Sequence, residues 1–399
     1  MLNKKTLKDF DFNEKKALVR VDFNVPMSKE VEGEIADDVR IRAAIPTIKH
    51  LMDNGAVVVL MSHLGRPKGE ANPKFSLEPV AKRLSELLGK EVDFIASDVV
   101  VDENVIARVN ELKPGQVALL QNTRYRNEEE KNDPDFSSQL AKLGDIYVND
   151  AFGTSHRAHA SNVGVSSILP SAVGMLVEKE ISVMGDALQN PERPFVAILG
   201  GAKVSDKIGV IENLLTKVDT VIIGGGMAYT FLKALGKEIG RSLLEEDKIE
   251  LAKEIMEKAR ERGVKLMLPV DGVIADGIDK DAVTEIVDID HIPADKEALD
   301  IGPETEKLFA EEIKKAKTVV WNGPMGVFEV KPFSSGTYAV AKALAEADAV
   351  TIVGGGDSAL AVELAGYKDE ITHVSTGGGA SLEFLEGKQL PGVEAIENA

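Results

Sequence analysis

Short apolar runs recur along the chain, and segments with helical spacing separate most of them. Each run has the length and β-branched content of a strand that is buried on both faces of a parallel sheet. The runs lie at 57–61, 117–120, 145–148, 195–199, 220–223, 318–321, 350–353 and 371–374. Leu77–Leu88 is a clear helical segment between two of them. This alternation predicts an α/β protein built on doubly wound parallel sheets.

The first strand candidate, Leu18–Val25, alternates between apolar and polar positions. Its polar positions, Arg20, Asp22 and Asn24, share one face of the predicted strand. Such a face either meets solvent or binds a polar ligand. The next segment, 37–48, predicts a helix whose first turns contain Arg40 and Arg42. Because arginines are unfavourable at that end of a helix dipole, we expect a functional role for one of them.

Basic residues follow the strands of the N-terminal half. After the run at 57–61 come Ser62, His63 and Arg66, after 117–120 come Arg124 and Arg126, and after 145–148 come His156, Arg157 and His159. Ligands of open α/β sheets bind at the carboxyl edge of the strands, where these residues would meet. The recurrence predicts a site for a small, highly anionic ligand. The pair His156 and His159 has no third zinc ligand near it in the sequence, so zinc is the weaker interpretation.

Glycine replaces the basic residues after the later strands. Past Pro191 and Pro194 the strands end in GGAKVSDK, GGGMAYTF, NGPMGVFE, GGGDS and STGGGAS. Glycine lets a base or a phosphate approach the backbone closely. We therefore predict a second α/β domain that binds a nucleotide. A predicted helix at Ala172–Leu188 links the two, which gives domains of 1–171 and 172–388 with 172–188 as the interdomain helix.

The stretch Ala349–Glu363 combines an apolar strand, three glycines and an alanine-rich helix. Free N–H groups and the positive end of the helix dipole make this turn a seat for a phosphate. Asp357 would repel a phosphate unless a cation lay between them, so we predict that Asp357 holds Mg²⁺ of a metal–nucleotide. The simpler alternative is a tight turn with Asp357 as an N-cap.

The same glycines nearly match the dinucleotide fingerprint, since Gly354, Gly356 and Ala359 have G-x-G-x-x-A spacing. That fingerprint needs an acidic residue at the end of the next strand. The next apolar run, 371–374, is followed by Ser375, Thr376 and Gly377. An NAD-dependent dehydrogenase of doubly wound α/β type is therefore kept as the alternative function.

Composition and charge narrow the class of protein. The 399 residues suggest two or three domains. The absence of cysteine excludes disulfides, thiolate catalysis and cysteine-held metals, so we expect a cytoplasmic protein. The first residues contain no apolar signal segment, and no run reaches membrane-spanning length. A net charge of −19 argues against nucleic acid or a membrane as partner, so an anionic ligand needs basic residues concentrated locally.

Lys203 and Lys207 are the strong bases among the glycine-rich turns, and they would share a face if GGAKVSDK opened a helix. The chain has no G-x-x-x-x-G-K-[ST] motif and no H-R-D motif, which excludes a P-loop enzyme and a protein kinase.

Seven motifs together resemble the phosphoglycerate kinase family over nearly the whole chain. They are VRVDFNVP at 19–26, SHLGRP at 62–67, NDAFGTSHRAHAS at 149–161, LGGAKVSDKIGVI at 199–211, VVWNGPMGVFE at 319–329, GGGDSA at 354–359 and HVSTGGGASLEFLEGKQLPG at 373–392. One departure is Gln121, where the family usually has glutamate, but Arg124 is intact. The resemblance implies reversible phosphoryl transfer between ATP and 3-phosphoglycerate, giving ADP and 1,3-bisphosphoglycerate, with Mg²⁺, in a two-domain hinge-bending monomer.

The resemblance also implies where the ligands bind. It places 3-phosphoglycerate against Asp22, Phe23, Asn24, Arg40, His63, Leu64, Gly65, Arg66, Arg124 and Arg157. It places the nucleotide against Gly201, Ala202, Lys207, Gly225, Gly302, Asn322, Pro324, Glu329, Gly354, Gly355, Gly356, Asp357 and Ser358. The catalytic set is Arg40, Lys203, Lys207 and Gly378. The last residues, 389–399, are expected to return to the N-terminal domain.

The chemistry of that reaction fits the residues. The acceptor is a carboxylate that is already ionised at neutral pH, so no general base is needed. Transfer requires in-line positioning and charge neutralisation. Arg40, Lys203, Mg²⁺ on Asp357 and the N–H groups of 377–379 could supply that neutralisation, although these glycines could equally form a plain turn. Because the two ligand sets belong to different domains, we expect the domains to close when both ligands bind.

Overall fold

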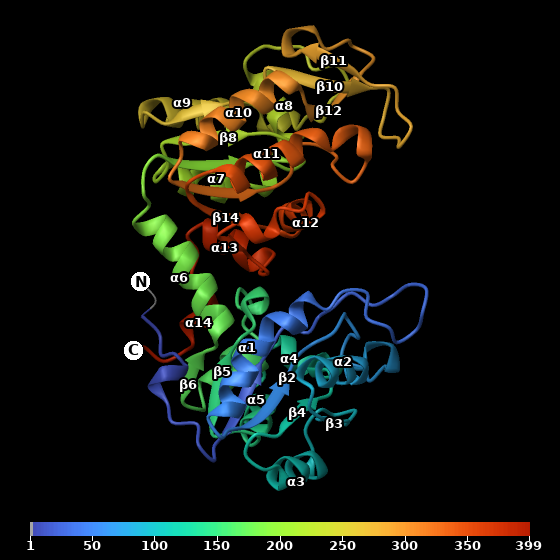
Figure 1. Ribbon diagram of the computed structural model, residues 1–399, viewed down its shortest axis with the longest axis vertical. Coiled ribbons are helices and arrows are strands. Elements are labelled where there is room, and N and C mark those ends of the chain that lie inside the picture. The colour runs from blue at the N-terminus through green and yellow to red at the C-terminus, as the bar shows by residue number, and fades with distance from the viewer. Residues whose placement is uncertain (1–2) are drawn as a thin grey trace. The chain divides into compact units, whose positions relative to one another are not determined.

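A computed structural model describes residues 3–399 and confirms an α/β fold with two parallel-sheet units (Figure 1). Unit 1 runs to Ser182 and includes Gln389–Ala399, whereas unit 2 is Val183–Lys388. The predicted boundary lay earlier, at 171/172, and assigned the whole linking helix to the second domain. In the structure that helix, α6 (Met175–Gln189), is shared between the units.

Within the described residues, unit 1 contains a six-stranded parallel sheet in the order β3-β4-β2-β1-β5-β6. Its strands are β1 (Lys16–Arg20), β2 (Val57–Met61), β3 (Val92–Ile95), β4 (Val117–Leu120), β5 (Ile146–Asn149) and β6 (Ser171–Val173). Its helices are α1 (Val39–Asp53), α2 (Glu78–Leu88), α3 (Glu103–Glu111), α4 (Asn127–Glu130), α5 (Pro134–Ala141) and α14 (Pro391–Glu394). The apolar faces of α1 and α2 pack on the sheet through Ile41, Ile48 and Leu84.

Two predicted elements of unit 1 differ from the structure. The strand predicted at 18–25 ends at Arg20. The Val21 N–H still donates to the Met61 carbonyl (3.1 Å), and beyond it the Val25 N–H bonds to the Phe23 carbonyl (2.8 Å), so the chain forms a turn there instead of continuing the sheet. The helix predicted from Ala172 begins only at Met175. Residues 171–173 instead pair with β5 as strand β6. An apolar run of three residues does not distinguish a strand from the start of a helix.

The C-terminal segment 389–399 lies against the start of the chain. The Lys5 N–H donates to the Glu397 carbonyl (2.9 Å), and the Glu397 N–H donates to the Ser171 hydroxyl (3.0 Å). The buried Asn149 side chain donates to the Gly392 carbonyl (2.8 Å). Unit 1 is therefore completed by residues from both ends of the sequence.

Within the described residues, unit 2 contains a six-stranded parallel sheet in the order β15-β14-β13-β7-β8-β9. Its strands are β7 (Phe195–Leu199), β8 (Thr220–Ile223), β9 (Lys265–Met267), β13 (Thr318–Asn322), β14 (Val350–Gly354) and β15 (His373–Val374). Its other helices are α7 (Ile208–Leu215), α8 (Met227–Ala234), α9 (Ile249–Glu261), α10 (Pro303–Lys315), α11 (Ser335–Glu346), α12 (Gly356–Leu364) and α13 (Gly379–Leu385). Phe309, Val340 and Val362 bring α10, α11 and α12 onto one face of the sheet around Trp321.

A second, antiparallel sheet in unit 2 was not predicted. In the described chain it has three strands in the order β11-β10-β12, which are β10 (Asp271–Ala275), β11 (Glu285–Asp288) and β12 (Glu297–Ile301). These strands contain acidic residues, and their apolar runs are only two or three residues long. Its edge strand β11 is largely exposed, so the sequence carries little burial signal there.

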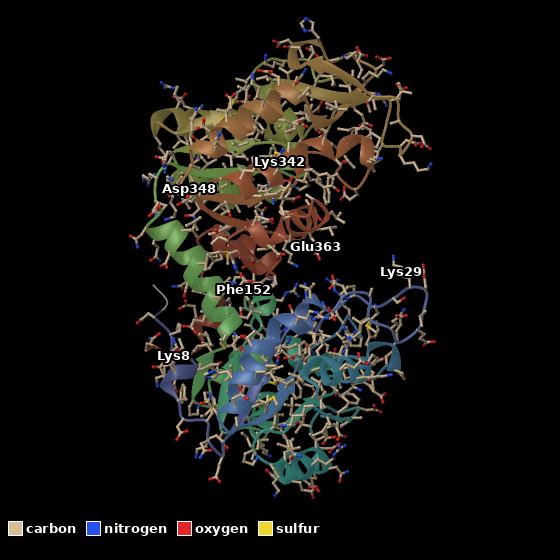
Figure 2. The ribbon with its side chains drawn as sticks, in the orientation of Figure 1. Lys8, Lys29, Phe152, Lys342, Asp348 and Glu363 are labelled. Carbon is tan, nitrogen blue, oxygen red and sulfur yellow. The ribbon has the colours of Figure 1, made fainter. Side chains whose placement is uncertain are left out.

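Charged side chains such as Lys342 and Asp348 lie at the outside of unit 2, whereas Phe152 is buried in unit 1 (Figure 2). In the part of the chain that the structure describes, no helix has both the length and the apolar character needed to cross a membrane.

Candidate active site

The segment after β1 is tied to the first turn of α1. The Arg40 guanidinium donates to the Asp22 carboxylate (3.1 Å) and to the Asn24 carbonyl (3.0 Å) through one nitrogen. The Arg40 side chain is still 36% exposed, so its other nitrogens can reach a ligand. The sequence predicted a functional arginine in the first turns of this helix, and in the structure the Asp22 carboxylate holds Arg40 in place.

Asn24 connects this segment to the turn after β2. Its side-chain oxygen accepts a hydrogen bond from the Gly65 N–H (2.8 Å), and the Gly65 carbonyl accepts one from Arg124 (3.0 Å). Gly65 has φ +60°, and a Cβ there would lie 2.5 Å from the Phe75 ring. Glycine is therefore required on both conformational and steric grounds. Leu64 is fixed in the same turn by hydrogen bonds in both directions with Asn122 (3.2 and 2.7 Å).

Arg20 lies on the strand face that the sequence left open between solvent and a polar ligand, and it was not in the ligand set that the family resemblance implied. It is 1% exposed, and it donates to the Ser161 hydroxyl (2.7 Å), to the Val21 carbonyl and to His63 Nδ1 (3.0 Å). A guanidinium has no acceptor, so His63 Nδ1 must accept and Nε2 carries the ring proton. Arg20 lies on β1, an inner strand of a parallel sheet, where both faces are buried. An arginine at such a position needs hydrogen-bonding partners, and this could have marked it as a site residue in the sequence.

The basic residues of unit 1 influence one another strongly. Burial, followed by the charges of Arg20 and Arg124, holds the pKa of His63 well below its usual value, so His63 is neutral at pH 7. Burial and the charges of Arg20 and Arg157 also lower the pKa of Arg124. Arg66 and Arg157 are exposed, and the Arg157 Nε donates to His156 (3.3 Å). This concentrated positive charge suits an anionic ligand.

His159 predicts a pH dependence of stability. Burial, outweighing the opposite effect of Glu129, lowers the pKa of His159 to about 4, with Arg20 and Arg124 adding to the decrease. The unfolded chain therefore binds more protons, and stability is lost as pH falls from about 6.5 toward 4. We expect about 2 kcal/mol less stability at pH 5 than at pH 7 from this group.

Urea unfolding of the full chain at both pH values tests this expectation. His159→Gln should weaken the pH dependence, whereas the same change at the exposed His291 should leave it unchanged. An equal pH dependence in the wild type and in His159→Gln would contradict the assignment.

In unit 2, the glycine turn after β14 is open on one side. Gly355 has φ +94°, and a Cβ there would lie 2.9 Å from the Asn322 amide, whereas a Cβ on Gly356 would meet nothing within 4 Å. The Asn322 side chain supports the turn by donating to the Gly354 carbonyl (2.9 Å). Ser358 is buried and accepts from the Gly323 N–H (2.7 Å), so it holds two turns together. Asp357 is exposed in the first turn of α12.

Lys203 and Lys207 would share a helical face only if the segment GGAKVSDK opened a helix, and in the structure it does not. A 3₁₀ turn at Val204–Asp206 separates them, and α7 begins only at Ile208. The burial of Val204 holds that turn in place. Lys203 is exposed, while Lys207 hydrogen-bonds to the Asn322 side-chain oxygen. Burial lowers the pKa of Lys207 against the opposing effects of Asp206, Asp357 and Glu386.

The ends of β7, β8 and β13 pack closely through glycine. The Gly201 N–H donates to the Pro324 carbonyl (3.0 Å), and a Cβ on Gly225 would lie 2.6 Å from Gly201 backbone atoms and 2.7 Å from the Pro324 oxygen. Side chains are therefore excluded here, and the backbone forms one wall of a pocket of about 260 Å³.

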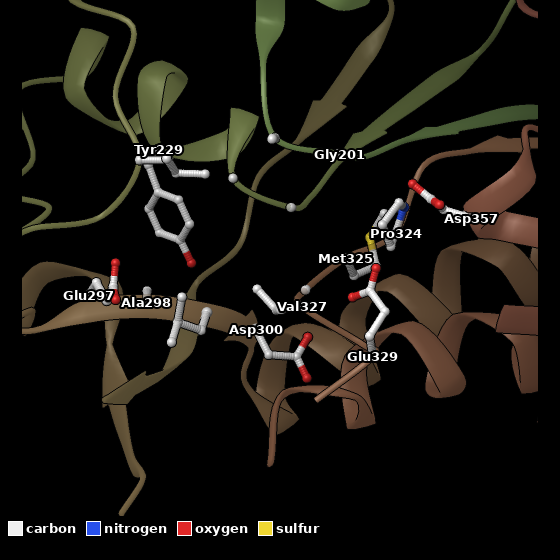
Figure 3. Close-up of a pocket in the computed structure, with 16 residues that line it drawn as sticks. Gly201, Tyr229, Glu297, Ala298, Asp300, Pro324, Met325, Val327, Glu329 and Asp357 are labelled. Carbon is white, nitrogen blue, oxygen red and sulfur yellow. The ribbon is translucent and has the colours of Figure 1, made fainter. Parts of the chain in front are cut away.

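Six predicted nucleotide residues line this pocket, which is shown in Figure 3: Gly201, Ala202, Gly225, Pro324, Glu329 and Asp357. The remaining predicted residues do not line it. Gly302, for example, is the N-cap of α10, where a Cβ would lie 2.3 Å from the Asp271 side chain. The far end of the pocket adds residues that the sequence reasoning missed: Tyr229, Leu243, Glu297, Ala298, Leu299 and Asp300. Several of these lie on or beside the unpredicted sheet.

Gly378, which belongs to the predicted catalytic set, is the N-cap of α13, and the helix begins at Gly379. Gly378 has φ +50°, and a Cβ there would meet nothing within 4 Å. The backbone at this turn therefore needs glycine for its conformation and is open to a ligand.

The residues present fit a magnesium ion that arrives with a nucleotide. Among residues 3–399, no group of three or more histidine, cysteine or acidic side chains could hold a metal by itself. Mg²⁺ usually binds through one or two carboxylates together with substrate phosphates and water. Asp357, exposed beside the open glycine turn and lining the pocket, supplies such a carboxylate.

Comparisons with known proteins agree on one family. The family model described as "Phosphoglycerate kinase" matches residues 7–388. The phosphoglycerate kinase of Finegoldia magna is 62% identical over 396 residues, covering 99% of this chain and 100% of that protein. That of Clostridium novyi is 61% identical over 398 residues, covering 100% and 99%. Two solved structures, from Coxiella burnetii and Pyrococcus horikoshii OT3, match with TM-scores of 0.90 and 0.84 at 42% and 35% identity, each covering 98% of both chains. The dehydrogenase alternative has no support among these relatives and is rejected.

Proposed function

The chain belongs to the phosphoglycerate kinase family, and we propose that unit 1 binds 3-phosphoglycerate while unit 2 binds the Mg²⁺–nucleotide. The enzyme is a phosphotransferase of that family. The observation that carries the proposal is the separation of charge between the units. Arg20, Arg40 and Arg124 lie in the connected segments of unit 1, whereas the pocket of unit 2 has no basic residue among its lining residues in the described chain. Glycine and apolar residues line that pocket together with four acids, Glu297, Asp300, Glu329 and Asp357.

Within unit 1, we assign the substrate phosphate to Arg66, Arg124 and Arg157. His63 presents its Nε2–H as a donor, since Arg20 occupies Nδ1. Asp22 and Asn24 hold Arg40 and the turn at Gly65, so they shape the site around the substrate. Arg40 then has guanidinium nitrogens available for the substrate carboxylate or the transferred group.

Within unit 2, we assign the nucleotide phosphates to the turn at 354–356 and to Lys207. Magnesium, when bound through Asp357, would neutralise phosphate charge and orient the nucleotide. The base would occupy the apolar end of the pocket. Phosphoryl transfer from ATP to a carboxylate then requires in-line placement and neutralisation of the transferred group, for which Arg40, Lys203 and the N–H groups at Gly378 are available.

A coupled assay of ATP consumption with 3-phosphoglycerate tests this function. We expect activity that depends on both substrates and on Mg²⁺. Oxidation or reduction of NAD(H) without phosphoryl transfer, or full activity in EDTA, would contradict the proposal.

The separate ligand sets predict a change of shape during the reaction. Reacting atoms must come within roughly 3–3.5 Å, so the two bound ligands have to meet. Neither ligand alone can contact both sets, whereas the two together gain contacts that stabilise a closed state. Small-angle X-ray scattering should therefore show the smallest radius of gyration with 3-phosphoglycerate and an unreactive Mg-ATP analogue together. The same radius in free, singly bound and doubly bound samples would contradict closure.

We further propose that the enzyme works as a monomer in the cytoplasm. One chain carries both ligand sets, so a second copy is not needed to complete a site. The lack of cysteine is typical of a protein that does not depend on disulfides.

A further inference from the structure

Asn122 is a fully buried residue whose side-chain amide uses every hydrogen bond that it can make. It lies just past β4 and is the N-cap of a 3₁₀ turn, Thr123–Tyr125. Its oxygen accepts from the N–H groups of Leu64 (3.2 Å) and Arg124 (3.0 Å). Its nitrogen donates to the carbonyls of Leu64 (2.7 Å) and Phe75 (2.9 Å). A primary amide has two donors and two acceptor lone pairs, so all four positions are paired.

These hydrogen bonds join three segments that are distant in the sequence. Leu64 belongs to the turn 63–66 after β2, Arg124 to the turn after β4, and Phe75 to the segment before α2. The bonds to Leu64 run in both directions, so this turn cannot shift relative to the end of β4 without breaking one of them. Phe75 adds a third constraint, because its ring lies so close to Gly65 that a Cβ there would be 2.5 Å away.

The joined segments carry the residues to which the substrate phosphate is assigned. His63 and Arg66 border the turn 63–66, and the Arg124 side chain donates to the Gly65 carbonyl of the same turn (3.0 Å). The position of Asn122 therefore sets how far the donors of the turn lie from Arg124. Asn122 itself is 0% exposed, so it acts through these neighbours and makes no contact with the ligand.

The parallel sheet alone does not provide this constraint. Strands β2 and β4 pair as far as Leu60, and the Thr123 N–H donates to the Ser62 carbonyl (3.1 Å), so both links come before the turn 63–66. Within residues 3–399, the hydrogen bonds from that turn to the segment after β4 are made by the side chains of Asn122 and Arg124. Arg124 also has to bind the substrate, whereas the Asn122 amide is used entirely in holding the protein.

We propose that Asn122 is a positioning residue for 3-phosphoglycerate, because it holds the turn 63–66 at a fixed distance from Arg124 before the substrate binds. This inference rests on the proposed function. A site whose donors are already in place loses less conformational entropy on binding than one whose donors the ligand must order. Since the amide is buried, water does not replace the hydrogen bonds that a shorter side chain would lose. Shortening Asn122 should therefore weaken substrate binding and leave nucleotide binding in unit 2 intact.

Asn122→Ser separates the positioning role from the cap of the local turn. A serine N-cap can still accept from the Arg124 N–H, but it has no amide donors for the Leu64 and Phe75 carbonyls. Titration calorimetry of the full chain gives the affinities for 3-phosphoglycerate and MgADP. We expect the variant to bind 3-phosphoglycerate about ten- to a hundredfold more weakly, the effect of misplacing hydrogen bonds to a charged ligand. Its affinity for MgADP should equal that of the wild type.

Asn72→Ser is the matched control. This exposed asparagine is also the N-cap of a 3₁₀ turn, Pro73–Phe75, and in the described chain its side chain accepts from the Lys74 N–H (3.0 Å) and holds no other segment. Serine replaces it as a cap, so neither affinity should change. Unchanged 3-phosphoglycerate affinity in Asn122→Ser would overturn the inference. An equal loss of affinity for 3-phosphoglycerate and MgADP would also overturn it, because that result indicates a general loss of structure.

Hydrogen exchange of the wild-type chain gives a second test that does not depend on the folding of a variant. Without ligand, the Leu64 and Arg124 amides should exchange at least about tenfold more slowly than the exposed Lys68 amide, which has no hydrogen-bond acceptor within residues 3–399. Exchange at the rate of Lys68 would show that the turn is not held before binding, and the inference would fail. Failure of the wild type to bind 3-phosphoglycerate would instead contradict the proposed function, a result that exchange in the free protein does not affect.

Discussion

Replacing Lys203 with alanine is expected to lower kcat by about 10³–10⁵ and to change KM only modestly, because the residue would act mainly on the transferred phosphoryl group. The surroundings of the two lysines, Lys203 and Lys207, differ. Lys203 is exposed beside the pocket residue Ala202, and it makes no hydrogen bond or ion pair within the described part of the chain. Lys207, by contrast, is partly buried and bonded to Asn322. An exposed ammonium that no group of the described chain holds is available to the phosphoryl group as charge develops on it.

Steady-state kinetics with both substrates at saturation measures this effect. Lys314→Ala on α10, an exposed lysine that does not line the pocket, is the matched control and should keep normal kinetics. Arg40→Ala should resemble Lys203→Ala, whereas Arg66→Ala should mainly raise the KM for 3-phosphoglycerate. A large KM change with nearly normal kcat for Lys203→Ala would reverse these roles.

Burial on both faces of the parallel sheets is what made their strands predictable from sequence. The residues of Val57–Met61 and Phe195–Leu199 are fully enclosed, so each strand is a continuous apolar run with sharp ends. The antiparallel sheet follows another rule. Asp271 and Asp300 lie inside it as acids, because they accept hydrogen bonds from the starts of α10 and α11. A pattern that equates burial with apolar residues cannot locate such strands.

Some residues of the candidate site could be predicted from the sequence and others could not. Arg124 and Asp357 could be predicted, because each is a charged residue that closely follows an apolar strand, where ligands of parallel sheets bind. Arg20 was visible only as a charge on a strand, and its contact with His63 depends on how β1 and β2 pair. Tyr229 was hidden inside a helix, because an aromatic residue there is normally part of the core, and here it belongs to a core cluster and also lines the pocket.

Asp357→Asn is expected to abolish the contribution of Mg²⁺ to nucleotide binding. If the carboxylate holds the metal, wild-type ADP affinity should increase when Mg²⁺ is added, and the variant should lose about ten- to a hundredfold of MgADP affinity, the range seen when a metal site loses a supporting group. Metal-free ADP should bind the variant no worse than the wild type, since removing a negative charge relieves repulsion with the phosphates. The rate should fall together with MgADP affinity.

A control variant distinguishes the loss of a metal ligand from the general effect of removing a negative charge from α12. Glu363→Gln changes an acid on the same helix, α12, at the opposite end from Asp357. Glu363, labelled in Figure 2, pairs there with Lys368 (3.7 Å). It removes one charge from α12 without touching the glycine turn, so the response of ADP binding to Mg²⁺ should stay intact. Calorimetric titrations of ADP with excess Mg²⁺ and with EDTA, for the wild type and both variants, give the comparison. If Asp357→Asn kept the full Mg²⁺ enhancement, the carboxylate would be only a helix cap, and the metal would have to be held by the phosphates and other groups.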